Sequence, residues 1–393
     1  MLAHRSPLPY MLLAGVLIGL TLLYHRSPHR AHRPLPPANA TLDFGGLFVV
    51  SGPGSPRRPY LEQAANVTGL ELTIPEQTAW TDEDVRNFRS SGLSESHILT
   101  GSVKAWLSHH VVLREFLASG LETAVIFEDD VDWDIRLKNI QIPLAQRTVR
   151  ALTRTTTDQR QYPWGYTADW DLLYIGHCGD YFGDVNKPLG VGHHHPHDLA
   201  GVPHALYVDH TMPDRTDLHP YTASLLSAFK LPEFTRVVHQ SVWPLCTFAY
   251  AINRNMAERI LDEIAPPKED PAKNLVAFDA AILVGCRDYG LKCLSVTPEL
   301  FHHMPGQSLI ASQESKERNI LLPPVDAAGL EQTHFRKETS NIQCGFSDGS
   351  FYFGTDNDRL ELLKEQIGRK NRCLKMGRDP DSGRPAHYRH LGW

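Results

Sequence analysis

The sequence has few cysteines, no basic excess and none of several short catalytic motifs. Six cysteines in 393 residues, with no Cys-x-x-Cys among them, argue against a disulfide-built miniprotein, a zinc ribbon or a thioredoxin-type site. Lys and Arg number 39 against 45 Asp and Glu, and a net charge of −6 argues against a nucleic-acid binder. The chain also lacks His-Glu-x-x-His and Gly-x-x-x-x-Gly-Lys, which excludes the readable signatures of zincins and P-loop enzymes. The remaining usage, 41% apolar and 21% charged, is that of a globular chain with one large or two ordinary domains.

One long uncharged stretch covers residues 8–24 and comes after a short tail, 1–7. At 1.5 Å per residue it spans about 26 Å, enough for a thin bilayer. A cleaved signal peptide is the alternative, but Tyr24-His25-Arg26 stands where a small-residue cleavage site would be expected. The arginines after the stretch, read by the positive-inside rule, place the C-terminal side of the chain in the cytoplasm. Glycosylation sequons at Asn39 and Asn66 point to the lumen, and we expect a type II signal-anchor with a lumenal body.

Beyond the anchor, the composition predicts three regions. Residues 25–41 are rich in Pro, Arg and His and predict a flexible stem, whereas 42–310 alternate apolar strands with amphipathic helices. Residues 311–393 read as a partly disordered extension with a loose tail from Gly368. The alternation predicts an α/β fold with a mixed, mostly parallel sheet flanked by helices. The segments that predict strands are 47–50, 70–74, 124–127, 171–175, 247–252 and 294–296. Those that predict helices are 102–117, 253–264, 278–289 and 360–367, and residues 81–84 predict the start of one more helix.

The clearest chemical motif is the acidic run after the apolar strand 124–127. Glu128, Asp129 and Asp130 come directly after it, and Asp132 stands one residue further on. Open α/β sheets bind ligands beyond the carboxyl ends of their strands. Adjacent carboxylates repel unless a cation neutralises them, and hard oxygen ligands suit Mg²⁺ or Mn²⁺. A solvated acidic turn is the alternative interpretation.

Two further positions have both a structural and a catalytic interpretation. Asp279 stands at the start of the helix predicted from Phe278, where Asp either caps the helix or acts as a general base on a hydroxyl. His302-His303 comes after the last predicted strand. The pair is either two surface histidines or the source of a neutral imidazole ligand that completes a Mn²⁺ shell.

The cysteines also allow cross-links in an oxidising compartment. Cys286 and Cys293 flank the segment between a predicted helix and strand, and Cys178 and Cys246 are a second possible pair. The spacing by itself leaves the connectivity open.

At this point the chain resembles glycosyltransferase family 25, the lipopolysaccharide-type galactosyltransferases, over roughly residues 45–310. Ser108-His109 is similar to the family's Ser-His helix, and 124–132 is similar to its strand that ends in Glu-Asp-Asp. Further segments similar to family blocks are 170–179, 237–239, 244–250, 278–279 and 298–303.

The resemblance implies a GT-A-like fold, a nucleotide-sugar donor, a divalent metal and inversion at the anomeric carbon. It implies that Asp279 is the base and that Arg57, Arg58, Ser108, His109, Glu128 and Asp129 bind the donor. It implies a metal site of Glu128, Asp130, Asp132 and His303, and an acceptor side that includes His239 and Tyr250.

One loop departs from the family pattern. Residues 51–56 are rich in Gly and Pro and lack the basic residue and the Asp that usually precede the Arg pair. The expected reaction is transfer of a hexose to a glycan or glycoprotein in the Golgi or endoplasmic reticulum. UDP-galactose is the first candidate for the donor. The alternatives are a non-catalytic carbohydrate-binding relative and a metal-dependent phosphohydrolase, which would need acids for two ions.

Overall fold

The computed structural model describes residues 35–386 except 90–95, 97, 183–194, 196 and 305–335. The chain divides into Met1–Pro36 and Pro37–Trp393, and every described helix and strand belongs to the second unit. The predicted tail, the anchor at 8–24 and most of the predicted stem lie outside the described residues. Within the described ranges, no helix combines the length and apolar character needed to cross a membrane.

A mixed eight-stranded sheet forms the centre of the second unit. Its strand order is β2-β1-β3-β10-β5-β11-β8-β7, and β10 and β8 run opposite to the other six strands. Two small antiparallel pairs, β4 with β12 and β6 with β9, lie outside it. The strands are β1 Gly46–Val50, β2 Leu72–Thr73, β3 Thr123–Glu128, β4 Val131–Trp133, β5 Leu172–Gly176, β6 Gly179–Asp180, β7 His204–Val208, β8 Thr235–Gln240, β9 Pro244–Leu245, β10 Ala249–Asn253, β11 Cys293–Thr297 and β12 Phe301–His303.

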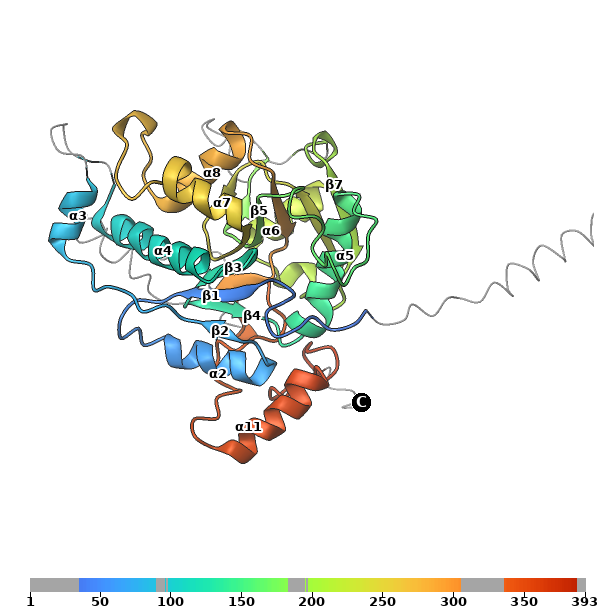
Figure 1. Cartoon of the computed structure of the whole chain (residues 1–393). Coiled ribbons are helices and arrows are strands. Elements are labelled where there is room, and N and C mark those ends of the chain that lie inside the picture. Colours follow the sequence, from blue (N-terminus) through green and yellow to red (C-terminus); the bar gives the residue numbers. More distant parts are fainter. Residues whose placement is uncertain are drawn as a thin grey trace, which may run out of the picture. The chain divides into compact units, whose positions relative to one another are not determined.

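Both faces of the sheet are buried, because successive side chains of a strand point to opposite faces. On β3, Val125 and Phe127 pack in the core that includes α2 and α5, whereas Ala124 and Ile126 pack in the core that includes α3, α4, α7 and α8. Figure 1 shows α4, α7 and α8 on one side of β1 and β3, with α2 on the other. The helices are α2 Arg58–Thr68, α3 Asp82–Phe88, α4 Thr100–Ala118, α5 Ile142–Leu152, α6 Pro220–Ala228, α7 Arg254–Arg259, α8 Phe278–Asp288 and α11 Asn357–Leu363; Ile260–Ile264 continues α7 and Lys364–Arg369 continues α11.

The predicted α/β alternation is confirmed, but the local patterns did not predict several elements, among them α5, β4, β8 and β12. The helix α2 was not predicted, although Pro59 in its first turn and a left-handed Gly69 at its end, with φ of 64°, are helix boundary signals. The segment 178–222, which has little apolar periodicity and many Gly, Pro and His residues, contains β6 and β7 and the start of α6. The sequence of β7 does not alternate between apolar and polar residues, because Leu206 and Val208 are apolar although they are exposed at the sheet edge.

Residues 336–386 belong to the folded unit, and the segment from Gly368 is not a loose tail over its described part, because Cys373 and Lys375 are buried. Leu360, Leu363 and Ile367 pack with Val67 of α2 in one buried cluster. The approach is close, because a Cβ on Gly368 would lie 2.4 Å from the carbonyl oxygen of Val67. The predicted boundary at residue 310 therefore does not separate this part of the chain from the core.

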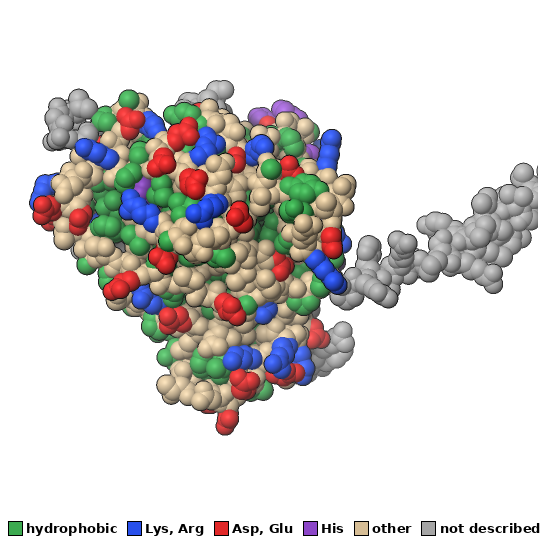
Figure 2. Space-filling view, in the orientation of Figure 1, with side chains coloured by type: hydrophobic (Ala, Val, Ile, Leu, Met, Phe, Trp, Pro, Cys, Tyr) green, Lys and Arg blue, Asp and Glu red, His purple; other side chains and the backbone are tan. Residues whose placement is uncertain are grey.

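Three disulfides cross-link the described chain. Cys178 pairs with Cys246 and Cys286 with Cys293, the two pairings that the sequence allowed, and Cys344 pairs with Cys373. On the face seen in Figure 2, acidic and basic side chains are interspersed.

Candidate active site

The predicted acidic run lies at the carboxyl ends of two parallel strands. Val50 and Glu128, the last residues of β1 and β3, are register partners, so the loops after these two strands leave the same edge of the sheet. Ser51 Oγ donates a hydrogen bond to Asp129 Oδ2 over 2.6 Å, and both residues are buried. This bond ties the acidic loop to the loop after β1.

Two arginines approach the acidic run from the loop between β1 and α2. Arg57 Nη1 donates to Asp130 Oδ2 over 2.7 Å and lies 3.7 Å from Asp129 Oδ1. Arg58 is held by its own loop, donating from Nε to Ser51 Oγ over 3.2 Å and from Nη2 to the Ser51 carbonyl oxygen over 3.1 Å. The Gly- and Pro-rich loop 51–56 thus holds Arg58 by hydrogen bonds, whereas the guanidinium of Arg57 lies against the carboxylates and offsets their negative charge.

His303 reaches the same carboxylate from the small sheet. It is the register partner of Val131, and its Nε2 lies 3.1 Å from Asp130 Oδ2. Burial would raise the pKa of Asp130, but the hydrogen bond from His303 and the charge of Arg57 outweigh it and lower that pKa. Burial would lower the pKa of His303, but its bond to Asp130 outweighs burial and raises that pKa. Both shifts favour a charged pair.

Glu128 lies among buried groups that disfavour its charge. Burial, and then the neighbouring Asp130 carboxylate, raises the pKa of Glu128 well above its ordinary value. His109 Nε2 lies 3.6 Å from Glu128 Oε1, and His109 Nδ1 lies 3.0 Å from the Tyr250 hydroxyl. Burial lowers the pKa of His109 to about 3, although Asp279 opposes this shift. The imidazole is therefore neutral, and its contact with Glu128 is not an ion pair.

Asp279 lies in the first turn of α8, but it is not the N-cap, which is Ala277. Its Oδ2 accepts the Cys246 amide over 3.2 Å, and its Oδ1 accepts the amide of the next residue over 2.9 Å. Burial raises the pKa of Asp279, and these two amide bonds offset part of that rise. The neighbouring Phe278 ring stacks on His109 with centroids 4.4 Å apart, which links the start of α8 to the carboxylate cluster.

Three of the four predicted metal ligands, Glu128, Asp130 and His303, lie close enough to shift one another's pKa values. Asp130 Oδ1 is buried and has no hydrogen-bond partner among the described residues. The charges of Asp130 and His303 both shift the pKa of Glu128, so the three groups interact. Two carboxylates with an imidazole are ligands that suit Mn²⁺. Within the described ranges, no three His, Cys, Asp or Glu side chains are gathered to hold an ion as they stand. The donor chemistry fits a metal, with Arg57 beside it.

Asp132, the fourth predicted ligand, does not join this group. Its Oδ1 accepts the Phe346 amide over 2.8 Å, and its Oδ2 accepts the Thr339 hydroxyl over 2.7 Å. The carboxylate approaches the chain so closely that a Cβ on Gly345 would lie 2.2 Å from Asp132 Oδ2. Asp132 therefore holds the C-terminal segment, and only glycine fits beside it.

The remaining predicted donor and acceptor residues separate into two groups. Ser108 lies beside His109, and its Oγ accepts the Trp80 indole N–H over 2.9 Å. Tyr250 is fully buried beneath the cluster through its bond to His109. His239 is not brought to the cluster: it is fully buried on β8, with Nε2 at 3.0 Å from Thr297 Oγ1.

Both predicted glycosylation sites present exposed asparagines. Asn39 lies in a turn, where its Oδ1 accepts the Thr41 amide over 2.9 Å. Asn66 lies on the outer face of α2, while the hydroxyl of its sequon partner Thr68 is buried and donates to the Ala64 carbonyl over 2.8 Å.

Sequence reasoning missed the C-terminal contribution to this region. Thr339 and Phe346 bond to Asp132 across more than two hundred residues, a contact that no local pattern signals. The segment also carries a Gly-x-Ser-x-Gly pattern at 345–349. Those residues lie in turns and bends and not between a strand and a helix, so the pattern is not a nucleophile elbow.

Comparison with known proteins adds little evidence about the function of this site. No protein-family model matches the chain, and no curated protein matches it. One similar solved structure is described as a glycosyltransferase involved in the glycosylation of the major capsid of PBCV-1. It shares 10% identity, covers 70% of this chain and 100% of its own, and has a TM-score of 0.28, which is too low to support a functional conclusion.

Proposed function

We propose that this protein is an inverting glycosyltransferase that moves a hexose, with UDP-galactose the first candidate donor, to a glycan or glycoprotein. The observation that carries the proposal is the cluster of Arg57, Asp130 and His303 at the carboxyl ends of β1 and β3. The sequence resemblance supplies the reaction class, and the cluster supports it because it brings cationic and anionic groups to one sheet edge.

In the proposed reaction, the acceptor hydroxyl oxygen attacks the anomeric carbon while the bond from that carbon to the diphosphate breaks. Asp279 takes the hydroxyl proton, a role supported by its raised pKa, since a stronger base accepts a proton more readily. Arg57 stabilises the negative charge that develops on the leaving diphosphate. His109 is neutral and positions Glu128 without adding charge.

We further propose that Glu128, Asp130 and His303 hold Mn²⁺ or Mg²⁺. When bound, the ion would supply positive charge for the diphosphate. The buried Asp130 Oδ1 supports this assignment, because it has no hydrogen-bond partner among the described residues and could accept an ion. Glu128 and His303, whose pKa values are raised, would have to lose their protons when the ion binds.

The compartment proposed is the lumen of the Golgi or endoplasmic reticulum, with residues 8–24 as a type II anchor. Three disulfides and no free cysteine among the described residues support an oxidising environment.

The test is calorimetric titration of the full-length protein with a panel of UDP- and GDP-sugars, first with Mn²⁺ and then with excess EDTA. Binding of one nucleotide sugar that EDTA abolishes supports a metal-dependent transferase. A folded sample that binds no nucleotide sugar contradicts the proposal; glycan binding without metal would then favour the carbohydrate-binding relative. Release of phosphate from phosphoesters without an acceptor would favour the phosphohydrolase.

A further inference from the structure

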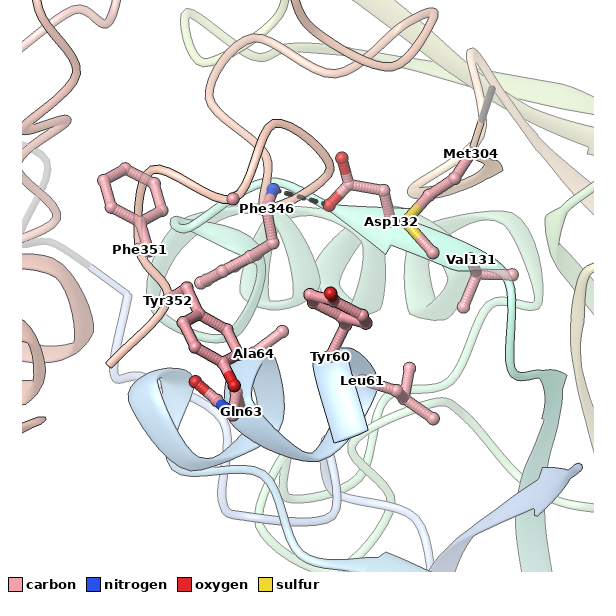
Figure 3. A pocket seen from close by; sticks show the side chains of 11 residues that line it. Tyr60, Leu61, Gln63, Ala64, Val131, Asp132, Met304, Phe346, Phe351 and Tyr352 are labelled. Carbon is pink, nitrogen blue, oxygen red and sulfur yellow. Dashed lines mark hydrogen bonds between the residues drawn. The ribbon is translucent and has the colours of Figure 1, made fainter. Parts of the chain in front are cut away.

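A groove opens beside the carboxylate cluster, on the side of the sheet that α2 covers. It is shallow and open, with about 410 Å³ of empty space when the solvent at its mouth is included, and it lies between α2, β4 and the C-terminal segment. Figure 3 shows Tyr60 at the end of α2, with Tyr352 to one side of it and Val131 and Met304 to the other. The C-terminal wall lies outside the 45–310 region that resembles family 25.

Two tyrosines at this groove are unusually exposed. Tyr60 is 58% exposed and Tyr352 48% exposed, and their ring centroids are 5.6 Å apart. Large aromatic side chains usually bury most of their surface, and exposed aromatic surface at a concavity marks a binding site. Gln63 fixes this arrangement, because its Oε1 accepts the amides of Phe353 over 3.0 Å and Gly354 over 3.2 Å, which anchors the loop that carries Tyr352 to α2.

Two backbone hydrogen bonds connect the walls of the groove to residues of the carboxylate cluster. The Tyr60 amide donates to the Arg57 carbonyl over 3.0 Å, so Tyr60 follows by one helical turn the residue whose guanidinium contacts Asp130. The Met304 amide donates to the Asp130 carbonyl over 2.8 Å at the opposite wall. A ligand whose charged part lies at Arg57 and Asp130 can therefore extend into the groove.

The two tyrosine rings give the groove a surface on which a planar group can stack. The one charged side chain among its described lining residues, Asp132, already has hydrogen-bond partners, because its carboxylate oxygens accept hydrogen bonds from Phe346 and Thr339. The part of a ligand that enters is therefore neutral. Aromatic stacking suits a nucleobase, since every base has a π-face that a tyrosine ring can cover.

The in-line geometry of the proposed reaction indicates which neutral part of the donor or acceptor enters the groove. The attacking hydroxyl and the leaving diphosphate lie on opposite sides of the anomeric carbon. Asp279 and His109 belong with α8 and α4, on one face of the sheet, whereas the groove lies against α2 on the other. With the diphosphate at Arg57, the hexose and acceptor lie toward Asp279, and the nucleoside lies toward the groove.

We propose that the groove binds the nucleoside of the donor. The rings of Tyr60 and Tyr352 are tilted by 44° to each other, so the base stacks on one of them and contacts the other at its edge. The inference rests on the proposed glycosyltransferase function and adds the residues that hold one part of its substrate.

The experiment compares the affinity of the full-length protein for UDP, GDP and inorganic pyrophosphate, each with Mn²⁺, by calorimetry. Tyr60→Ala and Tyr352→Ala are each expected to weaken binding of the preferred nucleotide by about 5- to 150-fold, the effect of losing one stacked base contact. Pyrophosphate affinity is expected to stay unchanged, because pyrophosphate carries the diphosphate without a base. Tyr289→Ala is the matched control, a tyrosine that is 46% exposed at the end of α8, away from the groove.

Tyr352→Phe keeps the ring and is expected to retain nucleotide affinity, which separates stacking from a folding defect. Unchanged nucleotide affinity in both alanine variants overturns the inference and leaves the transferase proposal standing. Equal weakening of nucleotide and pyrophosphate also overturns it, and a rise only in the KM for the acceptor would assign the groove to the acceptor glycan. A wild-type protein that binds neither nucleotide contradicts the transferase proposal itself.

Discussion

Arg57 and Asp130 are 73 positions apart in the chain, yet Arg57 Nη1 donates to Asp130 Oδ2 over 2.7 Å. The bond joins the loop after β1 to the loop after β3, two strands that pair in parallel. It places a cation against a carboxylate that also contacts His303. This triad is the centre of the proposed site, and the first prediction concerns it.

Asp130→Asn is expected to abolish Mn²⁺-dependent donor binding while leaving the fold intact. The amide removes the charge that a cation needs and keeps the size of the side chain. Asp262→Asn, at an exposed position on the segment that continues α7, is the control. Calorimetric donor affinity, with circular dichroism as the check of folding, measures the effect. Wild-type affinity in the Asp130→Asn variant would refute the metal assignment.

Asp279→Asn is expected to lower kcat by about 10²–10⁴-fold and to leave donor affinity nearly unchanged. The asparagine Oδ1 still accepts a backbone amide, so the start of α8 is preserved, but the side chain no longer accepts a proton. Steady-state kinetics with the identified donor and acceptor gives the kcat. If kcat stays within about twofold, the base is another group, and Glu128→Gln, at the neighbouring carboxyl with the raised pKa, is the next variant to measure.

Glu299 predicts a loss of stability in acid. Burial would raise its pKa, but the charge and hydrogen bond of His302 outweigh burial and lower it to about 2. The stabilisation is complete above the ordinary value near 4.5 and is lost as the pH falls toward 2, because the unfolded chain then binds the proton more tightly. Between pH 5 and pH 3 this amounts to about 2 kcal/mol.

The measurement is the free energy of urea unfolding at pH 5, 4 and 3 for the wild type and Glu299→Gln. The variant is expected to lose stability less steeply over that range, because glutamine does not titrate. Parallel slopes in the two proteins would show that Glu299 does not contribute to the acid transition.

The C-terminal disulfide is expected to stabilise the protein more than the short one beside α8. Cys344 and Cys373 are 29 residues apart, whereas Cys286 and Cys293 are separated by 7. Loop-closure entropy gives about 3.6 kcal/mol for the longer loop and about 2.4 kcal/mol for the shorter. Urea unfolding of the two double Cys→Ser variants tests the order, and an equal or reversed loss would contradict it.

Much of the α/β framework can be predicted from local patterns. The apolar run at 124–127 predicts β3, and Glu128 marks its end because a charged residue does not continue a buried strand. The apolar spacing from 102 to 117 predicts the interior of α4. These elements can be read from the sequence because their periodicity reflects burial on one face of a helix or both faces of a sheet.

The candidate site is predictable only in part. The order of the motifs places Arg57, Glu128 and Asp130 at strand ends, which is where the structure brings them together. The same pattern placed Asp132 with them, since its spacing from Asp130 says nothing about where its side chain finds partners. That choice depends on Phe346 and Thr339, which reach Asp132 only when the chain folds back.

The sequence alone determined the strand-and-helix alternation, the acidic strand end and a pair of possible disulfides. The tertiary structure decided which carboxylates share a neighbourhood, which tyrosines stand exposed together and that Cys344 pairs with Cys373. The physical reason is the sequence distance over which each interaction acts. Periodicity and capping act over a few residues, whereas burial, pKa shifts and side-chain hydrogen bonds depend on segments that only the folded chain brings into contact.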